Sequence, residues 1–279
     1  MSTLPDGGQI HLPSLSHRFS SKEVTMDLTM CGLLVDRAQE IAQLYQAHEN
    51  WNEVKEVWFG ERRSDRSTRG SSQKIFRVLT SRFKNAPSSL PNPSVLPAVL
   101  ASCGTTRDKA QVLYLYLVAD DPLVRYVVHQ YAQRLSTNQQ NPLDFSNETL
   151  ASILDQFEYA DGTPLDYADS TLERWYEGFR SVMRDIGVLE EQQTVAQQPP
   201  SLGAIPLLVS MGYAYEEGDD DWFESPIGLL YLFQPSDRWD ELYDRAARTD
   251  AWEFVELPGG LQLRPTSETY GWVTGGEST

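Results

Sequence analysis

Apolar residues recur at steps of three and four through most of this sequence, and this periodicity limits the fold more than any other feature. The clearest case is the stretch "DYADSTLERWYEGFRSVMRDIGVLE". Its apolar stripe comprises Leu172, Trp175, Tyr176, Phe179, Val182, Met183 and Ile186. Ser170 and Glu173 have the spacing of a capping box and Gly187 follows the last apolar residue, so a helix is predicted between them. The aromatic stripe is expected to pack in the core and not to bind a cofactor.

Similar patterns predict a mainly α fold with further helices. These run from about Leu33 to Tyr45, Asn52 to Phe59, Arg107 to Ala119, Pro122 to Leu135, and Leu202 to Tyr215, with others starting near Ser146 and Ser236. The segment "WEFVELPGGLQLRP" alternates apolar and polar residues around a Pro-Gly-Gly turn, which predicts a β-hairpin. A helix followed by a hairpin is typical of the end of a winged-helix module.

Proline-rich and low-complexity segments divide the chain into predicted regions. "APSSLPNPSVLP", residues 86–97, and "EEQQTVAQQPPS", residues 190–201, are the expected connectors. The predicted regions are a mobile tail over 1–25, an N-terminal helix-turn-helix domain over 26–88, a helical middle region over 95–190 and a C-terminal helical region with the hairpin over 200–279.

One segment has a charge opposite to that of the rest of the chain. The 279 residues include 23 Lys and Arg against 40 Asp and Glu, a formal net charge of −17. The segment "GERRSDRSTRGSSQKIFRVLTSRFK", residues 60–84 and here called the basic island, holds eight basic and two acidic residues. The remainder therefore has 15 basic and 38 acidic residues, so the asymmetry is local and large.

The second half of the basic island divides into two arcs on a helical wheel. Ile75, Phe76, Leu79 and Phe83 form an apolar arc, and Lys74, Arg77, Ser81 and Lys84 lie opposite. Ser67 and Ser71 are the best N-cap candidates for this helix. Three helices, the third basic and preceded by an approach rich in Arg, Ser and Thr, match a helix-turn-helix layout.

This pattern favours double-stranded DNA as the partner, since lysine and arginine side chains neutralise backbone phosphates. The expected nucleic-acid contacts are Arg62, Arg63, Arg66, Arg69, Lys74, Arg77, Arg82 and Lys84. Two alternatives remain open. The cationic face could dock on an acidic surface, of this chain or of a protein partner, or the chain could be an RNA-binding regulator. Aromatic residues are scarce within the island, which speaks against stacking on single strands.

Catalytic and metal-binding motifs are missing from the sequence, which predicts a non-enzymatic protein without cofactor or metal. No GxSxG, P-loop, GxGxxG or HExxH pattern occurs. Cys31 is expected to be a packed thiol and His129 a hydrogen-bonded structural histidine. The acidic segment of residues 216–221 lacks the ligand register of an EF-hand, so a solvated loop is expected.

Targeting and membrane signals are also missing. Residues 1–24 lack the pattern of a secretory signal, and the longest apolar stretch, "VLYLYLVA", is far shorter than the roughly 20 residues that span a membrane. We expect a cytoplasmic protein with no membrane partner and no small-molecule substrate. Five Lys against eighteen Arg, together with the acidity, fit either a salty cytoplasm or an ordinary acidic bacterial protein.

The order of these pieces resembles the BrxA family of the BREX phage-resistance systems. The resemblance covers roughly residues 26–273 and is carried by "LTMCGLLVDRAQEIAQLY", "WNEVKEVWFGERRSDRSTRGSSQKIFRVLTSRF", "DYADSTLERWYEGFRSVMRDIGVLE" and "WEFVELPGGLQLR". It implies an all-helical, DNA-binding accessory protein of antiviral defence, with an N-terminal helix-turn-helix and a core like that of the antitermination factor NusB. Other BREX components would be partners. The long N-terminal tail and the marked acidity depart from the family pattern.

Overall fold

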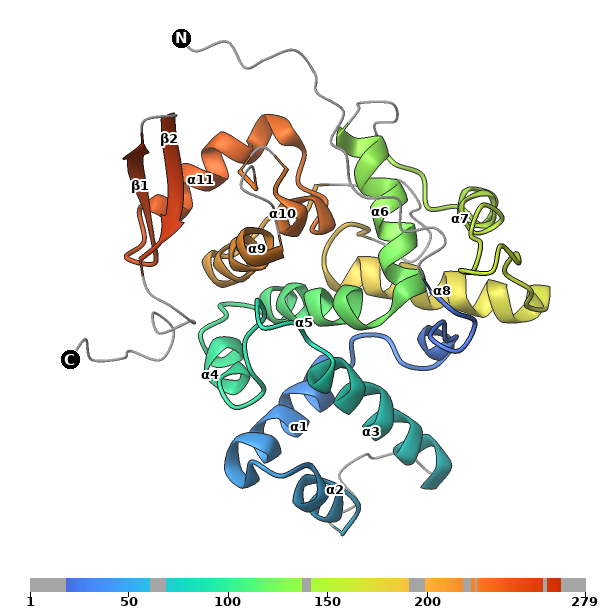
Figure 1. The fold of residues 1–279 in the computed structure, drawn as a ribbon. Coiled ribbons are helices and arrows are strands. Elements are labelled where there is room, and N and C mark those ends of the chain that lie inside the picture. The colour runs from blue at the N-terminus through green and yellow to red at the C-terminus, as the bar shows by residue number, and fades with distance from the viewer. Residues whose placement is uncertain are drawn as a thin grey trace.

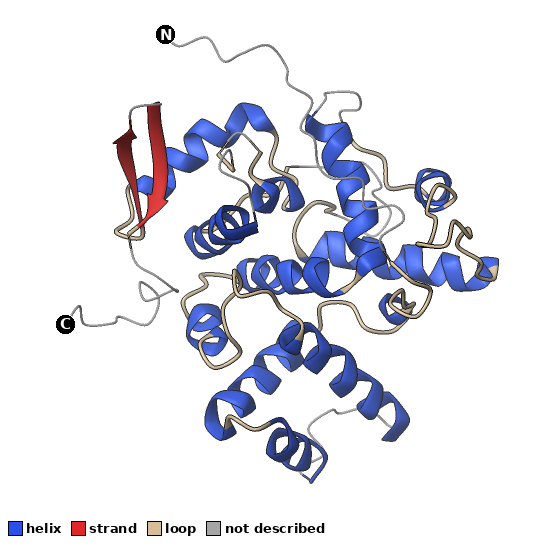
Figure 2. Ribbon diagram, viewed as in Figure 1, coloured by secondary structure: helices blue, strands red, loops and turns tan. Residues whose placement is uncertain are grey.

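A computed structural model of the chain describes residues 19–60, 69–136, 142–190, 199–217, 222–223, 225–257 and 260–266. Within these ranges the fold is mainly α, as predicted, with one two-stranded sheet near the C-terminal end (Figure 2). The order is η1 (Asp27–Thr29), α1 (Val35–His48), α2 (Trp51–Gly60), α3 (Arg69–Lys84), α4 (Leu96–Ala101), α5 (Thr106–Asp120), α6 (Pro122–Ser136), α7 (Asn147–Leu154), α8 (Asp169–Asp185), α9 (Ala204–Glu217), α10 (Ile227–Tyr231), η2 (Ser236–Arg238), α11 (Trp239–Ala247), β1 (Trp252–Leu257) and β2 (Gly260–Pro265).

Helix α5 is the centre of the molecule. It is buried on every side from Ala110 to Val118, and it contacts α1, α3, α6, α8, α9 and α10. In Figure 1 it crosses the middle of the view, with α1 to α3 below it and α9 to α11 above. A helix that is apolar all round must be enclosed by others, which explains why the longest apolar stretch of the sequence lies here.

The start of α5 is held by a capping box that the sequence patterns above did not predict. The Thr105 backbone N–H donates to the Asp108 carboxylate at 3.1 Å, and the Asp108 N–H donates back to the Thr105 hydroxyl at 3.1 Å. The predicted box of Ser170 and Glu173 is wrong, because α8 begins at Asp169 and Ala168 is its N-cap, without a side-chain hydrogen bond.

Helix α8 ends as its sequence predicts. Gly187 has a φ of +86°, and its N–H donates to the Arg184 carbonyl. A Cβ at this position would lie 2.9 Å from the Arg107 side chain, so both the backbone conformation and the close approach require glycine.

The C-terminal hairpin is confirmed. Strands β1 and β2 pair antiparallel from Trp252 opposite Pro265 to Leu257 opposite Gly260. Trp252 and Leu263 are buried, and Trp252 packs on Trp222 and on Tyr215 of α9. The hairpin therefore closes the end of the helical region and is joined to it by an aromatic cluster.

The predicted regions share one continuous cluster of buried apolar side chains. The segment predicted as a proline-rich connector contains the short helix α4, with Pro97 near its start. The division into domains and the likeness to the core of NusB stay predictions. No helix within the described ranges is both long enough and apolar enough to cross a membrane.

Candidate nucleic-acid interface

Helix α3 buries the apolar arc that the sequence predicted. Ile75, Phe76, Leu79 and Phe83 are all buried. Phe76 packs against the rings of Trp58 and Phe59 in α2, and Phe83 meets the edge of Tyr116 in α5. The start of α3 thus rests on α2 and its end on the central helix, and Figure 1 shows its first turns projecting away from the rest of the molecule.

The eight basic side chains expected to contact DNA separate into four groups. Arg62, Arg63 and Arg66 lie outside the described residues, and so does the side chain of Arg69, the first residue of α3. Of the others, Lys74 and Arg77 are close together, Arg82 is buried and Lys84 lies at the far end of the helix. Ser71 lies inside α3, so it is not the N-cap, and Ser67 falls outside the described residues.

Arg82 is not on the surface, which corrects its assignment as a nucleic-acid contact. Its side chain donates to the carbonyl oxygens of Gly32 at 2.7 Å and Cys31 at 2.9 Å, and the residue is 4% exposed. Burial lowers the pKa of Arg82, and the nearby Asp121 and Asp120 carboxylates oppose that shift. Arg82 ties α3 to the segment before α1.

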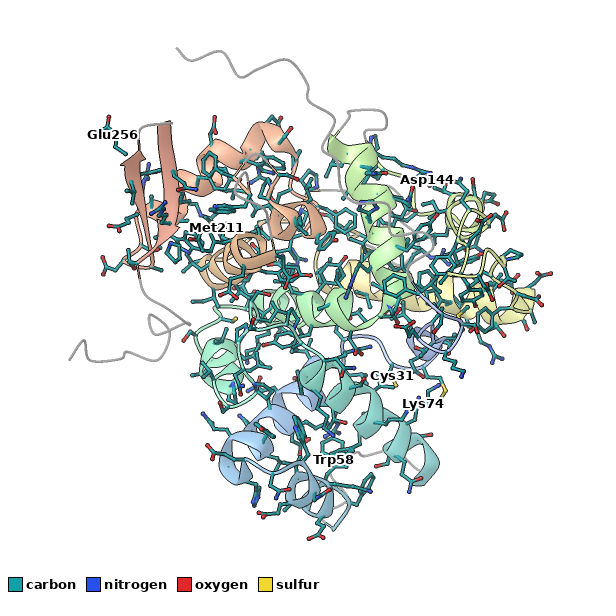
Figure 3. The ribbon with its side chains drawn as sticks, viewed as in Figure 1. Cys31, Trp58, Lys74, Asp144, Met211 and Glu256 are labelled. Atoms are coloured by element: carbon teal, nitrogen blue, oxygen red, sulfur yellow. The ribbon has the colours of Figure 1, made fainter. Side chains whose placement is uncertain are left out.

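Lys74 and Arg77 share one carboxylate. The Arg77 guanidinium lies 3.0 Å from Asp27 Oδ1 and 3.1 Å from Oδ2, and Lys74 Nζ lies 3.3 Å from Oδ1. Lys74 Nζ also contacts the sulfur of Met30 at 3.4 Å, and Figure 3 labels Lys74 where the segment before α1 passes α3. The Arg77 side chain is 66% exposed, against 28% for Lys74 and 19% for Asp27. This face therefore combines two cations with one anion.

Lys84 interacts with an aromatic ring. Its Nζ lies 5.1 Å from the ring centroid of Trp51, which packs on Tyr45. Such a cation–π contact is worth about 0.5–1 kcal/mol at an exposed site, so the exposed Lys84 ammonium remains available to a polyanion.

A cavity of about 390 Å³ lies between α3, the segment before α1 and the corner of α5 and α6. Its charged lining residues are Glu23, Asp27, Arg77, Arg82, Asp120, Asp121 and Arg125. Asp121 Oδ1 accepts from the Leu123 and Val124 N–H groups at the start of α6, at 3.0 and 3.1 Å. Burial raises the pKa of Asp121 to about 6, against the lowering effect of these bonds and of Arg82.

Two other candidate groups are structural. Cys31 is buried, as expected of a packed thiol. His129 is 2% exposed, but neither ring nitrogen has a hydrogen-bond partner, which corrects the expectation of a hydrogen-bonded histidine. Burial lowers the pKa of His129 to about 4, so the ring is neutral at pH 7. The described residues include no group of three or more His, Cys, Asp and Glu that could hold a metal ion.

Comparison with known proteins bears only on the fold. No family model matches the chain, and neither does any curated protein. A crystal structure of an uncharacterized protein from Magnetospirillum magneticum is similar, with a TM-score of 0.54 and 12% sequence identity. The match covers 75% of this chain and 99% of that one. The fold is therefore shared with a solved structure.

Proposed function

We propose that this chain is a non-enzymatic double-stranded DNA-binding accessory protein of a BREX anti-phage defence system. It binds through α3 and the Arg- and Ser-rich residues before it. The contacting side chains are Arg62, Arg63, Arg66, Arg69, Lys74, Arg77 and Lys84. The link to BREX rests on the family resemblance of the sequence.

The supporting observation is the division of α3 into two faces. Its apolar arc is buried against α2 and α5, while Arg77 and Lys84 stay exposed on the opposite arc. Because the rest of the chain is strongly acidic, a nucleic acid would be attracted to this face and repelled elsewhere. The charge distribution would thereby orient the protein on a duplex.

The first prediction concerns Lys74→Ala combined with Arg77→Ala, measured by fluorescence anisotropy on a labelled duplex over a salt series. Removing each phosphate contact should flatten the slope of log affinity against log salt by about 0.9, which is up to about 8-fold in affinity at 0.1 M salt. Arg248→Ala, an exposed change on α11, is the matched control, because it removes a positive charge far from α3. Unchanged affinity and slope in the double variant would show that this face is not the DNA site.

Protein–protein assembly is the second candidate function, and one observation favours it. Lys74 and Arg77 already pair with a carboxylate, that of Asp27, so the same face can receive acidic side chains of a partner. Co-purification with other defence components that survives nuclease treatment, together with no duplex binding at low salt, would support assembly over DNA binding.

A further inference from the structure

The carboxylate of Asp27 occupies the place on α3 where a phosphate would bind. A single carboxylate accepts from Arg77 at 3.0 and 3.1 Å and from Lys74 at 3.3 Å. These are the distances of charge-assisted hydrogen bonds, which the same cations also form with phosphate oxygens. A nucleic acid that uses Lys74 and Arg77 must therefore draw them away from Asp27 or bind them alongside it.

Asp27 is fixed, whereas the two cations are on long side chains. Its backbone carbonyl accepts from the N–H groups of Met30 and Cys31, and the neighbouring Leu28 is 1% exposed. Leu28 packs so tightly on α8 that a Cβ at Gly178 would lie 2.3 Å from its carbonyl oxygen. Arg77 in contrast is two-thirds exposed, so it is the partner that can turn toward a ligand.

We propose that Asp27 is a built-in competitor for phosphate that makes the α3 face selective for nucleic-acid backbones over single anions. This proposal rests on the proposed DNA-binding function. The competitor is held in place, so its effective concentration is high and a lone phosphate ion displaces it poorly. A duplex binds several basic side chains at once, and the sum of these interactions outweighs the loss of the Asp27 pair.

Asp27 could instead help by holding Lys74 and Arg77 in position, and charge decides between the two effects. The three side chains together carry a net charge of +1, and removing Asp27 raises it to +2. An ion pair exposed to solvent orders its partners only weakly. The Asp27 charge lies well within the Debye length of about 8 Å from any phosphate on this face, so its repulsion is not screened away.

The test is Asp27→Asn, which keeps the shape of the side chain and removes its charge. The duplex affinity at 0.1 M salt should rise on the order of tenfold, and the slope against log salt should steepen by about 0.9 to 1.8. Inorganic phosphate, compared with sodium chloride at equal ionic strength, should raise the melting temperature of Asp27→Asn more than that of the wild type. Asp244→Asn, an exposed change on α11, is the control and should behave as the wild type.

Different outcomes separate this proposal from the proposed function. If the wild type binds duplex and Asp27→Asn binds no tighter, or more weakly, Asp27 is not a competitor. If neither protein binds duplex even at low salt, DNA binding fails as the function, and the phosphate measurement alone judges Asp27. An equal effect of phosphate on both proteins then overturns the competitor role. Asp27→Ser provides a second variant should Asp27→Asn not unfold cooperatively.

Discussion

At the scale of single residues, buried charge is the feature of this protein with the clearest energetic consequence. Asp121 is buried beside Arg82, and burial raises its pKa to about 6 from an ordinary value near 3.8. His129 shifts the other way, since burial lowers its pKa to about 4. The folded state therefore holds a proton on Asp121 and excludes one from His129 over overlapping pH ranges, so the two effects partly cancel in the wild type.

Asp121→Asn isolates one of these effects. Because the folded pKa of Asp121 lies above the unfolded value, its contribution to stability is complete below pH 4 and is lost as the pH rises through about 6. Asn keeps an oxygen to accept from the Leu123 and Val124 N–H groups and does not titrate. Relative to the wild type, the free energy of unfolding of Asp121→Asn should be higher at pH 7.5 than at pH 5.0 by about 1 to 2 kcal/mol.

Urea unfolding of both proteins at the two pH values measures this difference, in which the titration of all other groups cancels. An equal gap between the proteins at pH 5.0 and pH 7.5 would mean that Asp121 titrates in the fold as it does in water.

At the scale of helices and strands, the sequence predicts whatever depends on local spacing. The apolar arc of α3, the glycine that ends α8 and the hairpin register all follow from patterns of a few residues. Arg82 also had such a signal, because it follows Ile75 and Leu79 at the spacing of the apolar arc. Its charge suggested an exposed contact, yet two carbonyl groups fifty residues away accept its hydrogen bonds.

The role of Asp27 had no local signal. It lies in a segment without periodicity, and its pairing with Lys74 and Arg77 depends on how η1 lies against α8. Contacts between segments far apart in sequence follow from packing of the whole chain, which no short pattern encodes. The predicted capping box of Ser170 and Glu173 fails for a related reason, because the helix can start earlier without a side-chain cap.

The contact between η1 and α8 leads to a prediction for Gly178→Ala. The added Cβ would meet the Leu28 carbonyl oxygen at 2.3 Å, so η1 or α8 must move. Alanine favours a helix over glycine by about 1 kcal/mol, but overpacking costs typically 1–3 kcal/mol, so we expect a net loss of stability of up to about 2 kcal/mol.

Gly70→Ala is the control for this change, since a Cβ at Gly70 in α3 has nothing within 4 Å. Urea unfolding should place Gly70→Ala at or above the wild type and Gly178→Ala below it. The same order for both variants, with Gly178→Ala at least as stable as the wild type, would show that η1 yields freely.

At the scale of the whole molecule, the net charge of −17 sets the response to salt. Self-repulsion among carboxylates destabilises the compact state, and salt screens it as the Debye length falls from about 10 Å at 0.1 M to about 3 Å at 1 M. Duplex binding depends on counterion release and must weaken over the same range. Folding and DNA binding should therefore respond to salt in opposite directions.

We expect sodium chloride to raise the free energy of unfolding by about 1 to 2 kcal/mol, or roughly 2–4 °C in melting temperature, between 0.02 and 0.5 M. Scanning calorimetry over a salt series measures this. Screening predicts that most of the rise occurs at the low end of the series. A rise that continues in proportion to salt up to 2 M would instead indicate exclusion of the salt from the protein surface.

The segment of residues 19–34 connects parts of the molecule that are distant in sequence. The Phe19 carbonyl accepts from the Ala160 N–H, Leu28 lies against Gly178 of α8, and the Cys31 and Gly32 carbonyls accept from Arg82. During synthesis this segment leaves the ribosome long before α8 exists. The N-terminal helices can form early, but the surface that fixes Asp27 beside α3 is complete only after α8 has emerged. A nascent chain stopped before α8 would thus expose α3 without its resident carboxylate.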